Sequence, residues 1–503
     1  MSLYNSLIRT IFSYRLRAIE KFRRDPIAVQ AAQLSRLLEA GCDTPLGKYY
    51  GLSRGLSYQE FCQRVPVVTY EEFTPWIERV LGGEHSAISA KPTRWLAKSS
   101  GTTNDRSKFI PINSPSLQDC HFRGGRDVLA LFTHLVPRSK ALTGKALTLG
   151  GSHQLVSEGS SLLQGDLSAI LIENTPSLIS KMREPKRSVA LMPSFDEKVE
   201  AICRSCSTQN VTSFAGVPSW NLVLMKRIME YNKCDTLLDI WPNLSLFIHG
   251  GMSFDPYRDQ YQKIIPSSQM SYFETYNASE GFFAMQDDLS DRSMLLMLDY
   301  GTFYEFLPFA ELDHPEKAVP LEGVRTGVNY AMIITTIGGL WRYMIGDTVE
   351  FTSTRPYKIK ITGRTKHFIN AFGEELIIDN AESALKRACE VTGAQVEEYT
   401  VAPIFMDDRA KGAHHWVVEF SKEPKDIALF RETLDQAIRD CNSDYGAKRT
   451  DNTTMSMLEL TVAPRGTFYG WMVGRGKLGG QNKVPRLSGK RDYLEGLLEI
   501  IKE

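Results

Sequence analysis

Apolar side chains recur every three to four positions over the first part of the chain, at Leu7, Ile8, Ile11, Tyr14, Leu16, Ile19 and Phe22. This spacing places them on one face of a helix, and the helical pattern runs through residues 1–40. The pair Asp25-Pro26 interrupts the pattern, and proline suits the first turn of a helix. We therefore expect two successive helices, the second beginning at Pro26.

The middle of the chain alternates between short apolar runs and helical patterns. The runs predict strands at 146–149, 245–248, 294–298 and 331–335. The helical patterns lie at 197–205 and 219–231. Such alternation predicts an α/β domain. Residues 152–165 are rich in glycine and serine, and we expect a loop there.

The C-terminal third has a different pattern. The predicted order is a helix at 380–392, strands at 397–403 and 415–420, a helix at 427–441 and a loop-rich end. This order predicts a small α+β unit. The run at 362–366 separates the two patterns. We expect a large α/β domain at 1–364 and a smaller α+β domain at 365–503, joined by a short hinge.

Composition and charge exclude several classes of protein. The 503 residues include 59 Lys and Arg against 59 Asp and Glu, with 42% hydrophobic and 23% charged residues. These fractions are ordinary for a globular chain. A nucleic-acid-binding protein usually carries a basic excess, and a membrane anchor often carries a polybasic run. We therefore expect neither a nucleic-acid partner nor a membrane partner.

The cysteines and the N-terminus indicate a cellular compartment. Eight cysteines in this length are too sparse for a secreted disulfide framework, and reduced thiols of the cytosol are the expected alternative. Arg9, Arg15 and Arg17 interrupt any apolar core of a signal peptide. No run of about 18 apolar residues predicts a membrane-spanning helix. We expect a cytoplasmic protein.

Residues 99–111, SSGTTNDRSKFIP, form the segment richest in potential chemistry. Hydroxyls, exposed amides and a lysine are the groups that bind phosphate oxygens. The segment lacks the second glycine and the Gly-Lys-Ser/Thr ending of a Walker A loop. A polar turn between two strands explains the same composition equally well.

Two further segments carry acidic side chains after strand-like runs. Residues 272–283 lead into a polar turn with Glu280, which could ligate Mg²⁺ beside a phosphate or merely face water. Residues 340–347 end in Asp347, which could accept both hydroxyls of a ribose, although a Gly-Asp pair is more often a turn. Gly363-Arg364 follows shortly after. Each segment is a weak signal by itself.

The order of these segments resembles the adenylate-forming superfamily, and within it the GH3 family of acyl-acid amido synthetases. The order is a Ser/Thr-rich loop, Tyr-x-x-Ser-Glu, Arg-Tyr-x-x-Gly-Asp, and Gly-Arg at a domain break. Other stretches are similar to family segments: TPLGKYYG at 44–51, VPVVTYE at 65–71, GVPSW at 216–220, HGGMSF at 249–254 and QNKVPR at 481–486. The resemblance therefore spans nearly the whole chain.

The resemblance implies a role for each matching residue. The residues implied to bind the ATP phosphates are Ser99, Ser100, Thr102, Thr103, Lys108 and Ser279. Tyr276 is implied to pack against adenine, and Asp347 to bind the ribose with help from Arg364. Glu280 is implied to hold Mg²⁺, and Lys483 to reach the α-phosphate from a mobile C-terminal domain. One departure from the family pattern is Asn104-Asp105, where many relatives carry glycine.

The implied activity is an ATP- and Mg²⁺-dependent ligase that adenylates a small carboxylic acid and transfers the acyl group to the amine of an amino acid. An acyl-CoA synthetase shares the first half-reaction and is the main alternative. A binding protein that keeps the fold without catalysis would lack Glu280, Asp347 or Lys483, and all three are present. The residues do not distinguish an indole acid, a benzoate or an aliphatic acid, nor do they identify the amino acid or the oligomeric state.

Overall fold

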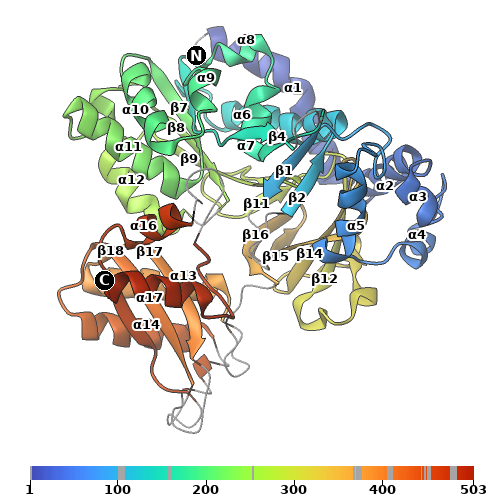
Figure 1. Ribbon diagram of the computed structural model, residues 1–503. Coiled ribbons are helices and arrows are strands. Elements are labelled where there is room, and N and C mark those ends of the chain that lie inside the picture. The colour runs from blue at the N-terminus through green and yellow to red at the C-terminus, as the bar shows by residue number, and fades with distance from the viewer. Residues whose placement is uncertain are drawn as a thin grey trace. The chain divides into compact units, whose positions relative to one another are not determined.

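A computed structural model describes residues 3–99, 108–156, 161–251, 254–365, 369, 376–404, 412–442, 445–446, 449, 455–475 and 484–502. Side chains at 3–9, 99, 195–196, 219–220 and 256 are outside this description. The chain divides into two compact units (Figure 1). The first comprises most of the chain up to Lys360. The second comprises the residues from Ile361 onwards together with Gly346–Thr348. The domain limits 1–364 and 365–503 stay a prediction.

The first unit begins with the two predicted helices. They are α1, Leu3–Arg24, and α2, Pro26–Gly41, and Asp25 separates them. The short helices that follow are α3 Pro45–Tyr49, α4 Tyr58–Arg64 and α5 Tyr70–Leu81. Ile19 and Phe22 of α1 are buried, as the spacing of the apolar positions predicted. Arg15 joins α1 to α6, Phe122–Leu135, through an ion pair of 2.7 Å with Asp127.

A twelve-stranded sheet is the largest of the three sheets in the described residues. Its strands, in spatial order, are β13 Val319–Pro320, β12 Thr302–Pro308, β14 Asn329–Thr336, β15 Tyr343–Thr354, β16 Tyr357–Arg364, β11 Met294–Leu296, β10 Gly281–Met285, β9 Ser271–Ala278, β8 Leu246–Gly250, β7 Val211–Gly216, β3 Lys145–Thr148 and β6 Arg183–Glu184. The run from β9 to β6 is parallel, and β9, β10 and β11 are antiparallel. The mixed sheet and its helices confirm the α/β class.

Helices accompany the parallel strands, as βαβ connections require. They are α7 Leu167–Glu173, α8 Ser177–Ser180, α9 Arg187–Ala190, α10 Phe195–Cys206, α11 Pro218–Asn232 and α12 Arg258–Ile264. Figure 1 shows α10, α11 and α12 beside β7, β8 and β9. Leu224 and Ile228 of α11 pack with Phe214 and Phe247 of the strands in one apolar core. The helices predicted at 197–205 and 219–231 are confirmed.

A separate four-stranded sheet lies in the same unit, in the order β2–β1–β5–β4. Its strands are β1 Trp95–Ser99, β2 Lys108–Ile112, β4 His153–Leu155 and β5 Leu163–Asp166. β4 and β5 pair antiparallel, so the loop predicted at 152–165 is wrong at its two ends. The strands there are very short, and β4 carries too few residues for an alternating pattern to stand out from the polar composition.

The second unit has its own sheet, in the order β17–β18–β19, and its own core. Its elements are α13 Ile378–Thr392, β17 Gln395–Ile404, β18 Ala413–Lys422, α14 Ile427–Cys441, β19 Glu459–Ala463, α16 Thr467–Gly474 and α17 Asp492–Lys502. The predicted α+β order is confirmed up to α14. The loop-rich end is wrong, because β19, α16 and α17 lie there. Within the described ranges, none of the helices has the length and apolar character needed to cross a bilayer.

Candidate functional site

The hairpin of β9 and β10 presents Ser279 and Glu280 at its turn. Ala278 pairs with Gly281, so only these two residues connect the strands, as the polar turn after a strand-like run predicted. Ser279 is 1% exposed, and its hydroxyl has no hydrogen-bond partner among the described residues. A buried hydroxyl without a partner is costly and is rare in folded proteins. The turn therefore has a donor that suits a ligand oxygen.

A lysine and a tyrosine lie near the same turn. Lys108 opens β2, and its ammonium lies 5.3 Å from the centre of the Tyr70 ring. Burial raises the pKa of the Tyr70 hydroxyl, and the charges of Glu71 and Glu280 raise it further. The first unit thus carries a cation against an aromatic ring at the start of β2, and a carboxylate next to an unpartnered hydroxyl at the turn of β9 and β10.

The carboxyl ends of the parallel strands adjoin this hairpin. β7 ends at Gly216 and β8 at Gly250, in register with residues of the neighbouring strand. A Cβ at Gly250 would lie 2.3 Å from the carbonyl oxygen of Thr275, so only glycine fits this close approach of two backbones. In open α/β sheets, ligands bind at the carboxyl ends of the strands. The hairpin and the strand ends thus form one candidate ligand-binding region.

Tyr276 lies on β9 and is nearly buried, with its ring centre 5.1 Å from that of Phe283. Its packing against adenine stays a prediction. His249, at the end of β8, is also buried and stacks on Phe254 with ring centres 4.3 Å apart. Burial, assisted by the charge of Arg258, lowers the pKa of His249 to about 3. This histidine is neutral at physiological pH, and its contacts are those of a structural residue.

Asp347 and Arg364 meet on neighbouring strands. Arg364 ends β16, and its Nε lies 2.8 Å from Oδ1 of Asp347 in β15. Asp347 lies within the strand and not in a turn after it, which differs from the simple Gly-Asp turn. Gly346 has a φ of +92°, a backbone conformation that favours glycine. The structure therefore brings together the pair that was predicted to bind a ribose.

Several predicted residues cannot be placed. The side chain of Ser99 is outside the described residues, as are Ser100, Thr102, Thr103 and Lys483. The strands on either side of residues 100–107 are described: β1 and β2 pair antiparallel, with Ser99 opposite Lys108. The contacts with phosphate expected of these five residues stay predictions.

Glu280 fits a magnesium ion that takes most of its ligands from elsewhere. No cluster of three or more His, Cys, Asp or Glu side chains able to hold a metal occurs within the described ranges. Mg²⁺ commonly binds through one or two carboxylates, with substrate phosphates and water as its other ligands. One carboxylate beside an unpartnered hydroxyl matches that arrangement.

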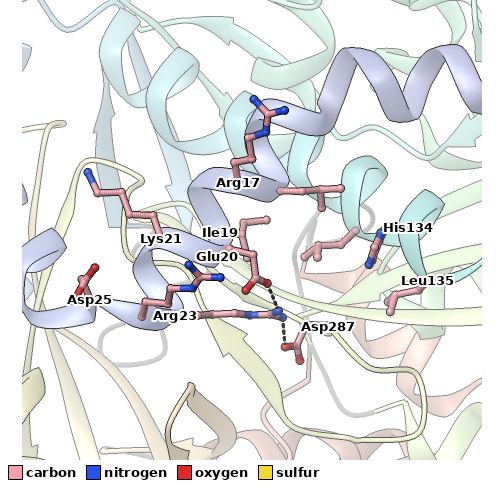
Figure 2. Close-up of a pocket in the computed structure, with 12 residues that line it drawn as sticks. Arg17, Ile19, Glu20, Lys21, Arg23, Asp25, His134, Leu135 and Asp287 are labelled. Carbon is pink, nitrogen blue, oxygen red and sulfur yellow. Dashed lines mark hydrogen bonds and ion pairs between the residues drawn. The ribbon is translucent and has the colours of Figure 1, made fainter.

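A cavity of about 630 Å³ lies at the ends of α1 and α6 (Figure 2). Figure 2 shows Arg23 bound to both Glu20 and Asp287 along its wall. None of the residues predicted for nucleotide binding lines this cavity. Among the described residues, this cavity is therefore separate from those predicted to bind the nucleotide.

Tyr70 contacts Lys108, a residue predicted to bind phosphate, and the sequence did not single it out. Its hydroxyl accepts a hydrogen bond of 2.8 Å from the backbone amide of Phe109, which is 39 residues away in the chain. A contact between a hydroxyl and a distant amide has no sequence pattern. The only available signal was that Tyr70 lies in the family-like stretch at 65–71.

Comparison with family models supports the assignment suggested by the geometry. Residues 15–270 match the model of the GH3 family N-terminal domain, residues 295–364 that of the GH3 family central domain, and residues 379–492 that of the GH3 family C-terminal domain. The three matches follow one another along the chain and include most of its length.

Individual proteins give the same result. The chain is 24% identical to indole-3-acetic acid-amido synthetase GH3.4 of Arabidopsis thaliana, over 94% of this chain and 91% of the relative. It is 23% identical to jasmonoyl–L-amino acid synthetase JAR6 of Nicotiana attenuata, over 96% and 95%.

Solved structures show the same fold at low sequence identity. GH3.15 acyl acid amido synthetase matches with a TM-score of 0.80 at 18% identity, covering 97% of this chain and 95% of the other. A 2-hydroxyisobutyryl-CoA ligase in its postadenylation state matches with a TM-score of 0.61 at 12% identity, covering 94% and 91%. The chain therefore has the fold of these two enzymes.

Proposed function

Because the chain belongs to the GH3 family, as its match to the three GH3 domain models shows, we propose that it is an acyl-acid amido synthetase that uses ATP. It adenylates a small carboxylic acid and transfers the acyl group to the amine of an amino acid. The observation that carries the proposal is the Ser279–Glu280 turn, where a buried hydroxyl without a partner adjoins a carboxylate, in a chain that matches the three GH3 domain models at 15–270, 295–364 and 379–492. The reaction class, a ligase that forms carbon–nitrogen bonds, follows from the family.

In the first half-reaction, a carboxylate oxygen of the acid attacks the α-phosphorus of ATP. The bond from that phosphorus to the bridging oxygen breaks, and pyrophosphate leaves. Lys108 and the Ser279 hydroxyl oppose the negative charge on the phosphates, together with Ser99, Ser100, Thr102 and Thr103. Glu280 would hold Mg²⁺, which supplies further charge neutralisation on the phosphate oxygens when bound. The work of the protein is thus positioning and electrostatic stabilisation.

The nucleoside is proposed to bind the pair on β15 and β16. Asp347 accepts hydrogen bonds from both ribose hydroxyls, and Arg364, which already contacts the Asp347 carboxylate at 2.8 Å, keeps that carboxylate in place. Tyr276 packs against the adenine.

In the second half-reaction, the amine of an amino acid attacks the carbonyl carbon of the acyl-adenylate. The bond to the phosphate oxygen breaks, AMP leaves, and the nitrogen loses a proton as the amide forms. We place Lys483 at the α-phosphate during the first half-reaction. A rotation of domain 365–503 about residues 364–366 then withdraws it and admits the amine.

An acyl-CoA synthetase is the second candidate, because a CoA ligase shares the fold with a TM-score of 0.61. Amide formation is favoured, because the relatives that match over 94% and 96% of this chain are amido synthetases.

All eight cysteines are free thiols, which supports a reducing compartment and hence the cytoplasm as the proposed location.

A pyrophosphate-release assay tests the proposal. The purified protein is supplied with MgATP and a panel of indole, benzoic, jasmonic and aliphatic acids, with amino acids or CoA as acceptors. We expect pyrophosphate release with at least one acid and an amide product with at least one amino acid. Release with no acid would refute the enzyme, and a thioester without an amide would favour the CoA ligase.

A further inference from the structure

The segment Val68–Tyr70 links two separate sheets of the first unit. The amide of Val68 donates to the carbonyl of Arg342 at 3.0 Å, and the amide of Met344 donates to the carbonyl of Val68 at 2.8 Å. Two residues later, the Tyr70 hydroxyl accepts from the amide of Phe109 in β2. The segment therefore joins the start of β15 to the strand that carries Lys108, and Figure 1 shows α5 beside β2.

Tyr70 holds Lys108 in two different ways. Its hydroxyl bonds the amide of Phe109, which fixes the backbone directly after Lys108. Its ring lies under the Lys108 ammonium at 5.3 Å, within the range of a cation–π interaction. One contact restrains the backbone and the other restrains the end of the side chain.

The tyrosine itself is held firmly. It is the first residue of α5, where Thr69 and Glu72 form a capping box and the Thr69 amide donates to the Glu72 carboxylate at 2.7 Å. Lysine has a flexible stem that loses rotamer freedom when it binds phosphate. A ring fixed at a helix start reduces that loss, because the ammonium is already placed.

We propose that Tyr70 is a positioning residue for the triphosphate: its ring holds the ammonium of Lys108 in place at the start of β2. The proposal rests on the proposed function, since it takes ATP as the ligand. Tyr70 acts through Lys108, and so its effect is confined to ligands that carry the β- and γ-phosphates. The affinity for AMP, which lacks these phosphates, should not change when Tyr70 is replaced.

Calorimetric titration of MgATP and of AMP, without any acid, tests this directly. Tyr70→Phe removes the bond to Phe109 and keeps the ring, and we expect about 3- to 10-fold weaker MgATP binding. Tyr70→Leu also removes the ring, and we expect MgATP binding to be about 10- to 30-fold weaker than in the wild type. AMP affinity should change less than about 2-fold in both. Equal weakening of MgATP and AMP, or no weakening of MgATP, would overturn the proposal.

Two further variants separate positioning from folding. Tyr330→Phe is the matched control, because it also removes a tyrosine hydroxyl that accepts a hydrogen bond from a backbone amide, that of Arg325 at 3.0 Å, in the same unit. Its MgATP affinity should equal that of the wild type. In a Lys108→Met background, Tyr70→Leu should change the affinity for MgATP by less than about 2-fold, because the ammonium that Tyr70 positions is then absent. A full effect in that background would show a structural role only.

The outcome is distinguishable from failure of the proposed function. A wild-type protein that binds MgATP but releases no pyrophosphate with any acid refutes the synthetase, and the binding comparison still decides the role of Tyr70. A wild-type protein that does not bind MgATP overturns both.

Discussion

Ser279 and Glu280 occupy a two-residue turn, so the geometry of one hairpin sets the positions of a hydroxyl and a carboxylate together. Lys108 comes from a different sheet, and Tyr70 places its ammonium. The local charge that a triphosphate requires is therefore assembled from single residues. No excess of positive charge over the whole chain is needed, since Lys and Arg equal Asp and Glu in number.

Glu280→Gln should slow pyrophosphate release about 100-fold, because the neutral amide binds Mg²⁺ poorly and the lost stabilisation amounts to several kcal/mol. The loss should be largest at low Mg²⁺ concentration. Glu311→Gln, at an exposed ion pair of 2.7 Å with Lys317, is the control and should behave as wild type. A rate for Glu280→Gln close to that of wild type would show that this carboxylate does not act on the metal.

Two buried histidines predict how stability depends on pH. Burial lowers the pKa of His121 to about 4, and burial together with Arg258 lowers that of His249 to about 3. In the unfolded chain both titrate near 6.5, so only the unfolded state binds their protons between these values. Their contribution is present above pH 6.5 and is lost as the pH falls below it.

His249→Asn should therefore lose less stability than wild type between pH 7.5 and pH 5.5, by about 1.4 kcal/mol, since one pH unit below 6.5 corresponds to that amount per proton. Urea unfolding at the two pH values measures it. An equal pH-dependent loss in both proteins would mean that His249 is accessible to protons in the folded state.

At the scale of elements, a buried ion pair joins α4 to the sheet. Arg342 binds Glu305 of β12 through Nε and Nη2 at 2.9 Å, and its Nη1 donates to the carbonyl of Val65, directly after α4. Tyr58 of α4 also donates to Glu305. Arg342 has a φ of +42°, which is rare for a residue with a side chain. These contacts hold it in that conformation.

Glu305→Gln should destabilise the first unit by about 3–5 kcal/mol, because it leaves the Arg342 charge buried without its partner. Glu84→Gln, which removes an exposed pair of 2.7 Å with Arg79, should change stability by less than about 1 kcal/mol. Thermal unfolding of the two variants makes the comparison. Similar small losses of stability in both variants would contradict a stabilising role of the buried Arg342–Glu305 pair.

The elements predictable from sequence are those whose pattern is long or sharply bounded. α1 and α2 have a repeating apolar face, and a proline marks where the second begins. β4 has only three residues, so its pairing with β5 decides its conformation more than its local pattern does. α17 does carry a helical pattern, with Leu494 and Leu497 buried three positions apart, and the prediction of a loop-rich end missed it.

The geometry of the candidate site was predictable where it coincides with contiguous motifs. The turn with Glu280 and the pair of Asp347 with Arg364 follow from segments that the sequence places in order. Tyr70 and the Arg342–Glu305 pair depend on residues 37 or 39 positions apart, and nothing in either local sequence indicates its partner. Contacts of that kind require the fold.

At the scale of the whole molecule, the two units have separate hydrophobic cores. Phe132 belongs to the core of the first unit and Leu434 to that of the second, and both are fully buried. We expect two calorimetric transitions. Leu434→Ala should lower the midpoint temperature of only one transition, and Phe132→Ala that of only the other. Each substitution should cost about 2–5 kcal/mol of stability, which lowers the midpoint by a few degrees. One transition that shifts equally in both variants would show a single cooperative unit.

The central claim is that the chain activates an acid as its acyl-adenylate. The direct measurement supplies an acid substrate labelled with ¹⁸O in its carboxylate, together with MgATP and an amino acid, and determines by mass spectrometry where the label goes. An acyl-adenylate leaves one carboxylate oxygen on the phosphate, so the account predicts ¹⁸O in AMP and none in pyrophosphate. Label in orthophosphate, accompanied by ADP, would show an acyl-phosphate intermediate and contradict the account.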